Sequence, residues 1–283
     1  MRIDPAIGLH RIVGVLCVVV LGAMALTGCQ SLSGKHVAQS EGRRVEVVRR
    51  GAVQPGAPTV VFEAGLGFGA GHWDKVMNAL EQAPTAPMFA YSRPGYGDSQ
   101  PAGSASDPAS IARRLHALLA AESVPPPYVL VGHSLGGVYV QTFAALYPNE
   151  VAGLVLVDPT HPRQWHAMNE RAPRDAKLVS ALSVAFSPAM KREFEASKEK
   201  VAALAEPYRG PVILLAAKRP DAISSAEFTT LRRELLEDMG HTYGVSPRWI
   251  DASHNIHRDD PSAVASAIRA LLSPPRIFGA RAC

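Results

Sequence analysis

One serine stands where its hydroxyl could act as a nucleophile. Ser134 lies in VGHSLGGVYV (131–140), between an apolar run typical of a buried strand and an apolar run typical of a helix. Gly132 and Gly136 flank it and allow a turn too tight for larger residues. Such a turn exposes the hydroxyl and aims the next helix N-terminus at it, where negative charge is favoured. The pattern predicts nucleophilic catalysis at Ser134, whereas His133 is expected to pack rather than react.

A serine nucleophile requires a base within hydrogen-bond reach and a carboxylate that orients this base. His254 is the favoured base, because it follows the strand-like RWID stretch (248–251) and precedes a predicted helix start at Asp260. His257 is the alternative base. The pair His254-x-x-His257 also has metal-ligand character, but no carboxylate or Cys cluster at ligand spacing supports it, so we expect neither a metal nor a cofactor.

Two aspartates are candidates for the orienting acid. Asp158 closes AGLVLVDP at the end of an expected strand, and Asp221 follows PVILLAAKRPD after the next strand. Asp221 lies well past the last apolar residue of its strand and behind Pro220, so its loop would have to reach far to bring the carboxylate to the histidine. Asp158 directly follows its strand and needs no such loop. We favour Asp158 and retain Asp221 as the alternative.

Elements that would position these residues alternate along the chain. Helical patterns over 108–122, 135–147 and 260–272 separate short apolar runs, several of them rich in β-branched residues. The runs span 45–48, 59–62, 88–91, 128–131, 153–157, 212–216 and 248–250. Such alternation predicts an α/β fold, with a mostly parallel central sheet and helices on both faces. Ligands bind beyond the carboxyl ends of the strands in such sheets, which is where Ser134 is expected.

A charged, helix-prone insertion at about 160–209 separates two of these strands. We expect it to form a lid over an apolar pocket, although a helical pair packed on the core would give the same pattern. The expected lining consists of Trp165, Met168, Phe186, Met190 and Phe194.

With these residues in place, the sequence resembles the α/β-hydrolase family over nearly all of 45–273. The GHSLG pentapeptide matches the family's nucleophile elbow, and SHNIHRDDP (253–261) is similar to its terminal histidine segment. The resemblance implies the chain order Ser, acid, His. Most members carry the acid where Asp221 lies, and some subfamilies carry it where Asp158 lies.

The resemblance also implies an oxyanion hole. VFEAGLGFG (61–69) falls where the family carries its oxyanion loop, but Ala64-Gly65 replaces His-Gly, so the side chain that often braces this loop is absent. The implied donors are the backbone N–H groups of Leu66 and Leu135, with Gly67 as the fallback. A plain glycine-rich turn is the alternative. YSRPGYGDS (91–99) resembles a family loop of structural role, with Ser92 in place of its first Asp.

Composition limits the class of protein. The 283 residues are 47% hydrophobic and 19% charged, which is enough for a sizeable core. The net charge of +4 is spread along the chain, and no nucleic-acid motif accompanies it, so no nucleic-acid partner is expected.

The N-terminus reads as a targeting segment, with Arg2 and Arg11 before an apolar run at 12–26. At roughly 15 residues the run is short for a spanning helix, which needs about 20. It ends in Leu26-Thr27-Gly28-Cys29, which resembles the lipobox of bacterial lipoproteins. The alternative is a plain signal peptide with a chance cysteine.

The lipobox resemblance implies removal of residues 1–28, lipid on Cys29 and a polar tether over 29–44, followed by the catalytic domain at 45–283. Gln30 after the cysteine implies the outer membrane of a Gram-negative envelope. Because Cys17 lies in the signal and Cys29 would be acylated, only Cys283 remains, and no disulfide is expected.

Together these features predict a serine hydrolase, and we favour a carboxylic-ester hydrolase acting on a small ester with an apolar acyl group. The same triad could instead serve acyl transfer or cofactor-free peroxidation. A catalytically silent, surface-binding lipoprotein is the non-enzymatic alternative. The sequence assigns no oligomeric state.

Overall fold

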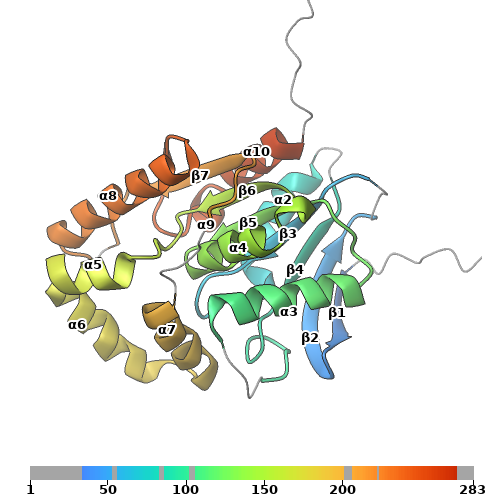
Figure 1. Ribbon diagram of the computed structural model, residues 1–283, viewed down its shortest axis with the longest axis horizontal. Helices are drawn as coiled ribbons and strands as arrows, with labels where there is room; N and C mark the ends of the chain where they lie inside the picture. The colour runs from blue at the N-terminus through green and yellow to red at the C-terminus, as the bar shows by residue number, and fades with distance from the viewer. Residues whose placement is uncertain are drawn as a thin grey trace, which may run out of the picture. The chain divides into compact units, whose positions relative to one another are not determined.

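A central β-sheet with helices on both faces forms the body of the computed structural model (Figure 1). The structure describes residues 34–52, 56–82, 86–101, 106–200, 206–221 and 223–272. The predicted signal peptide, Cys29 and Cys283 lie outside these residues. Among the helices that are described, none is long and apolar enough to cross a membrane.

The sheet has the strand order β1-β2-β4-β3-β5-β6-β7-β8. β1 pairs with β2, and β2 with β4, in antiparallel fashion, and the remaining neighbours are parallel. The strands are β1 (Gly34–Ser40), β2 (Arg43–Arg50), β3 (Thr59–Glu63), β4 (Met88–Tyr91), β5 (Tyr128–His133), β6 (Val151–Val157), β7 (Val212–Ala217) and β8 (Arg248–Ile250). The predicted mostly parallel sheet is confirmed.

Strand β1 lies where the sequence predicted a polar tether. Residues 34–40 lie inside the segment predicted as a polar linker (29–44), yet they form an edge strand that ends in a two-residue turn at Glu41 and Gly42. Both turn residues have positive φ, as hairpin turns of this length favour. Ala38 is the one buried residue of β1, so backbone pairing rather than burial forms the strand, and no apolar pattern announces it.

The central strands are buried because helices cover both faces of the sheet. In β5, Tyr128 and Leu130 face one core while Val129 and Val131 face the other. The first face is covered by α3 (Pro108–Ala121), α4 (Leu135–Leu146) and α8 (Ala226–Tyr243). The second is covered by η2 (Ala70–Trp73), α2 (Asp74–Glu81), α9 (Ile256–Asp259) and α10 (Pro261–Leu272).

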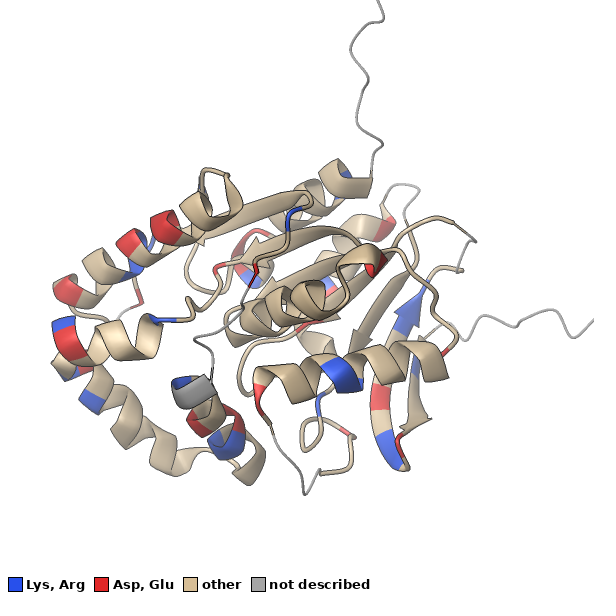
Figure 2. Ribbon diagram, in the orientation of Figure 1, with Lys and Arg blue, Asp and Glu red and all other residues tan. Residues whose placement is uncertain are grey.

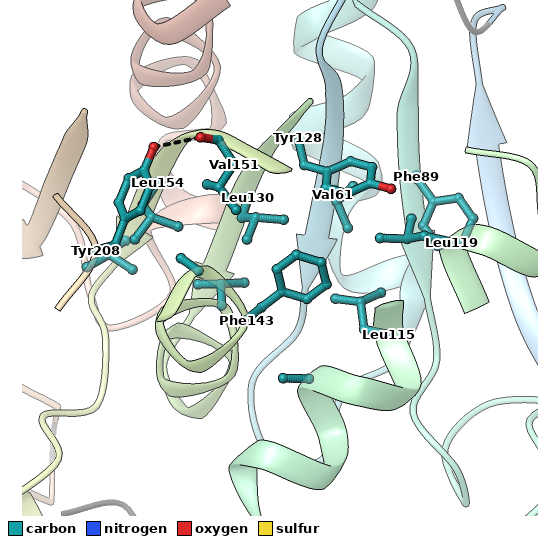
Figure 3. Close-up of a cluster of buried hydrophobic side chains, with 14 of the residues drawn as sticks. Val61, Phe89, Leu115, Leu119, Tyr128, Leu130, Phe143, Val151, Leu154 and Tyr208 are labelled. Atoms are coloured by element: carbon teal, nitrogen blue, oxygen red, sulfur yellow. Dashed lines mark hydrogen bonds between the residues drawn. The ribbon is translucent and has the colours of Figure 1, made fainter. Parts of the chain in front are cut away.

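Figure 3 shows the first core, in which Phe143 of α4 meets side chains of the sheet and of α3, among them Leu130 and Leu115. At one end of this core the Tyr208 hydroxyl donates to the Val151 carbonyl at 2.8 Å. α4 is apolar on nearly every side, which fits its burial between the sheet and α3. The nucleophile turn therefore leads into a helix held firmly in the core.

Between β6 and β7 lie the insertion helices, which we define as α5 (Gln164–Arg171), α6 (Pro173–Leu182) and α7 (Pro188–Lys200). Figure 2 shows both acidic and basic residues on the insertion helices and α8. Some join the insertion to α8: Arg171 pairs with Glu234 at 2.6 Å, and Arg163 with Asp238 at 2.6 Å. The helix-prone insertion predicted from the sequence is thus helical.

Candidate active site

Ser134 occupies a strained turn between β5 and α4. Its φ of 52° and ψ of −123° lie in a region that residues with a side chain rarely adopt. Backbone hydrogen bonds hold it there: its N–H donates to the Val157 carbonyl at 3.2 Å, and its carbonyl accepts from Gly137 at 2.9 Å and from Thr160 at 3.0 Å. The surrounding structure thus stabilises a conformation that exposes the hydroxyl.

The glycines beside Ser134 are required by close backbone approach. A Cβ on Gly132 would lie 2.6 Å from the Gly136 carbonyl oxygen and 2.6 Å from the Val140 side chain. A Cβ on Gly136 would lie 2.6 Å from the Ala64 carbonyl oxygen. These contacts explain the flanking glycines and bring the turn against the end of β3.

A histidine and an aspartate meet beside this turn. His254 Nδ1 lies 2.6 Å from Asp158 Oδ2, although 96 residues separate them in the chain. Asp158 directly follows β6, and His254 follows β8, so the common edge of the parallel strands brings them together. With Nδ1–H donated to the carboxylate, the neutral ring has its free lone pair on Nε2, the atom that a general base uses.

Asp158 is buried in a site that favours its ionised form. Its Oδ1 accepts from the Ala217 N–H at 2.9 Å, and the Arg232 guanidinium of α8 contacts both oxygens. Burial opposes ionisation, but the hydrogen bond and charge of His254, the charge of Arg232 and the Ala217 N–H outweigh it and lower the pKa of Asp158. The carboxylate therefore stays charged at neutral pH.

Of the candidate acids and bases, the structure joins Asp158 to His254 and places Asp221 and His257 elsewhere. Asp158 contacts His254, whereas the Asp221 side chain is exposed in the loop after β7. His257 is fully buried on α9, and neither of its ring nitrogens has a hydrogen-bond partner in the described structure. Arg232 was missed from the sequence, because nothing in an exposed-looking helix pattern links it to a carboxylate 74 residues away.

Leu66, Ser134 and Leu135 line one cavity, so the predicted oxyanion donors lie on the same side as the nucleophile. Leu135 is the first residue of α4, where backbone N–H groups have no partner within the helix. Gly67, the fallback donor, has a φ of 87° and lies against Met190 of α7.

Arg93 braces the loop that carries Leu66. Its guanidinium is buried and donates to the carbonyl of Ala64 at 2.6 Å and to that of Gly65 at 2.8 Å. The same group pairs with Glu63 at 2.6 Å and with Glu193 of α7 at 2.9 Å. Burial disfavours the cation, but Glu193 and Glu63 outweigh it and raise the pKa of Arg93. The missing histidine brace is thus replaced by an ion network.

The sequence predicted only a structural role for the loop around Arg93, and nothing in it indicated the contact with the oxyanion loop. The residue that completes the network, Glu193, is 100 positions away on a helix whose pattern is merely charged. A buried arginine needs acidic partners, but only the three-dimensional structure shows which ones they are.

The cavity beside Ser134 has a volume of about 230 Å³. Its walls are mainly apolar and come from the oxyanion loop, the start of α4 and the insertion helices. The insertion and α8 contribute the apolar Trp165, Met168, Val179, Phe194 and Phe228, with Thr160, His161, Gln164, Ser197 and Lys198 as polar members. Of the predicted lining, Phe186 instead meets Phe194 edge to face with ring centres 5.6 Å apart, and Met190 covers Gly67.

Three more histidines lie behind His254. His133 Nε2 is 2.9 Å from the His254 carbonyl oxygen, which can only accept, so this nitrogen carries the proton. Its Nδ1 then accepts from His72 Nε2 at 3.0 Å. Burial lowers the pKa of His133 far below its usual value, that of His72 to about 2 and that of His257 to about 3. All three rings are neutral at neutral pH.

Comparisons with known proteins agree with this architecture. A family profile described as "alpha/beta hydrolase fold" matches residues 58–183. The uncharacterised protein YqjL of Bacillus subtilis (strain 168) is 28% identical over 220 residues, which cover 74% of this chain and 81% of YqjL. "Putative carbamate hydrolase RutD" of Cronobacter turicensis is 36% identical over 107 residues, or 37% of this chain and 38% of RutD.

Among solved structures, a membrane phospholipase A described as a bacterial virulence factor superposes with a TM-score of 0.61. It shares 20% sequence identity, and the match covers 94% of this chain and 97% of that one. The chain therefore has the α/β-hydrolase fold. The resemblance to that family, carried by the GHSLG turn, is confirmed.

The Arg93 network leads to a prediction about Glu193. Glu193→Gln keeps the side-chain shape but leaves Arg93 with a single carboxylate in a buried site. We expect a loss of about 3 kcal/mol in unfolding free energy, because a buried ion loses its compensating charge, and weaker substrate binding as α7 loosens. Chemical denaturation and KM measurements check this.

Glu195→Gln is the matched control, since Glu195 lies on the same helix with an exposed side chain and pairs with nearby Lys198. It should change stability by no more than about 0.5 kcal/mol. Equal losses in the two variants would contradict the role given to the buried network.

Proposed function

We propose that the protein is a serine hydrolase that cleaves carboxylic esters through an acyl-enzyme. The observation that carries the proposal is the 2.6 Å hydrogen bond between His254 and the buried Asp158, next to the strained turn that presents Ser134. A histidine held by an ionised carboxylate, and a serine that lines a cavity at the start of a helix, are the parts that nucleophilic acyl transfer needs.

The proposed reaction begins when Ser134 Oγ attacks the acyl carbonyl while His254 Nε2 takes its proton. Asp158 remains ionised and stabilises the imidazolium that forms. The N–H groups of Leu66 and Leu135 hold the oxyanion of the tetrahedral intermediate. His254 then protonates the leaving alkoxide, and water repeats both steps to release the acid and the free serine.

The apolar cavity supports a substrate with a hydrocarbon acyl group. Its volume of about 230 Å³ and its walls from Met168, Val179 and Phe228 suit a short to medium chain better than a polar acyl group. The shared fold with a membrane phospholipase A supports an ester as the reacting group. The partial likeness to RutD makes a carbamate the second candidate, since a carbamate carbonyl would meet the same nucleophile and oxyanion donors.

Ser134→Ala should keep the fold and lower turnover of p-nitrophenyl acyl esters by roughly 10³-fold or more. The reason is that no other group at the turn offers a hydroxyl to the carbonyl. Labelling of the wild-type chain with a fluorophosphonate, followed by peptide mass spectrometry, should place the label on Ser134. A label on another serine, or full activity in the variant, would disprove the assignment.

Asp158→Asn should lower turnover by about 10⁴-fold, the effect of the equivalent change in a serine protease, because it removes the charge and favours the wrong His254 tautomer. Asp221→Asn is the control of equal chemistry: its side chain is exposed in the structure, and we expect nearly unchanged rates. Steady-state kinetics on p-nitrophenyl butyrate, with circular dichroism for the fold, separates the two. A crippled Asp221→Asn enzyme beside an active Asp158→Asn enzyme would reverse the assignment.

We further propose, from the Leu26-Thr27-Gly28-Cys29 motif, that the protein is anchored to a bacterial envelope membrane by lipid on Cys29. Mass spectrometry of the protein from membranes should find an N-terminal diacylglyceryl-cysteine, and Cys29→Ala should release the chain from the membrane fraction. A mature chain that starts at another residue without lipid would refute the anchor.

A further inference from the structure

We infer that His72, His133 and His257 form a binding site for one divalent transition-metal ion of the class that imidazole ligands select, with Zn²⁺ as the representative. Each residue offers one nitrogen, and these three atoms lie within 4.8 Å of one another. The site is separate from the proposed Ser134–His254–Asp158 triad, and it requires neither the hydroxyl nor the carboxylate of that triad.

The spacing of the nitrogens is close to that of ligands around one ion. His133 Nδ1 and His72 Nε2 are 3.0 Å apart. Two nitrogens bound to tetrahedral zinc at 2.0–2.1 Å lie roughly 3.3 Å from each other. His257 lies with its ring centre 3.7 Å from that of His72, and its ring would have to turn to bring the third nitrogen to the ion. A water molecule would supply the fourth ligand.

His133 already has the orientation of a metal-bound histidine. Its Nε2–H donates to the His254 main-chain carbonyl at 2.9 Å, which fixes the tautomer and leaves the lone pair on Nδ1, where it accepts from His72 Nε2 in the absence of the ion. Metal-bound histidines usually donate their other nitrogen in this way to a carbonyl or a carboxylate. When the ion binds, His72 moves its proton from Nε2 to Nδ1, so both rings stay neutral and no net proton is released.

His257 provides the independent observation. It is fully buried, and both ring nitrogens lack a hydrogen-bond partner in the part of the chain that the structure describes. A buried polar group without a partner costs about 1–3 kcal/mol, and native proteins seldom leave one unexplained. A metal ion between the three rings gives one of these nitrogens a partner.

The donor set determines the kind of ion. Three imidazoles suit Zn²⁺, Ni²⁺ or Cu²⁺, whereas Mg²⁺ and Ca²⁺ prefer oxygen ligands, which this cluster does not provide. Through His133 the ion would also hold the main chain of His254 in place. We therefore expect the bound ion to stiffen the support of the proposed catalytic histidine without touching the substrate.

The test is a titration of the untagged, chelator-treated full-length protein with ZnCl₂ by calorimetry. We expect one ion per chain, and a d–d absorption spectrum typical of nitrogen ligation when Co²⁺ replaces zinc. Single changes His72→Gln and His257→Gln should each weaken zinc binding at least tenfold. His72 is only half-buried, so its variant tests the site even where His257→Gln misfolds.

Two controls decide whether the ion sits in this cluster. His166→Gln removes an exposed histidine of α5 and should leave the affinity unchanged. His254→Gln removes the triad imidazole but keeps the main-chain carbonyl, and zinc binding should persist. Absence of stoichiometric binding by the wild-type chain would overturn the proposal, as would binding that survives both cluster changes or disappears in His254→Gln. None of these outcomes depends on esterase activity.

Discussion

The buried guanidinium of Arg93 is the interaction on which the geometry of the site depends. A cation removed from water is unstable unless its donors are all directed at acceptors, and here they meet Glu63, Glu193 and the carbonyls of the oxyanion loop. One group therefore fixes the end of β3, the loop that carries Leu66, and helix α7. Because the requirement is electrostatic, it defines positions more sharply than the apolar contacts around it.

Two residues of the site have strained backbone conformations. Ser134 and Asp158 both have positive φ, at 52° and 44°. Each is held by a hydrogen bond from its own N–H to the neighbouring strand: Ser134 to Val157 of β6, and Asp158 to Leu215 of β7. Rigid parallel strands thus stabilise the unfavourable turns that follow them, and they place the hydroxyl and the carboxylate at one edge of the sheet.

Much of this could be predicted from local patterns. Short stretches of sequence each predict the GHSLG turn, the buried strands beside it and the helix after it. Together they also predict the fold class. The choice between Asp158 and Asp221 stayed open, because it depends on how far a loop reaches. The sequence did not predict β1, because its side chains are mostly exposed and show no apolar pattern. The strand is held by backbone hydrogen bonds, which do not depend on side-chain type.

The long-range polar contacts lay beyond sequence reasoning for a different reason. Arg93 with Glu193, Arg232 with Asp158, and His72 with His133 are pairs that the fold creates between elements 61 to 100 residues apart. Taken alone, Arg93, Glu193 and Arg232 resemble ordinary surface or turn residues. Their partners become visible only when the sheet order and the crossing of the helices are known.

The attachment of α7 to Arg93 is a buried polar contact that holds the insertion, and another joins Asp175 of α6 to Ser225 at the start of α8. If α7 swung away, Arg93 would lose a carboxylate inside the protein, whereas α6 and the turn after it have exposed apolar side chains, with Leu182 at 49% and Val184 at 77%. The insertion therefore presents apolar side chains to solvent at the turn between α6 and α7. Exposed apolar side chains that lie close together mark surfaces that bind other molecules, so under the proposed function this turn is the surface that would contact an aggregated or membrane-borne ester.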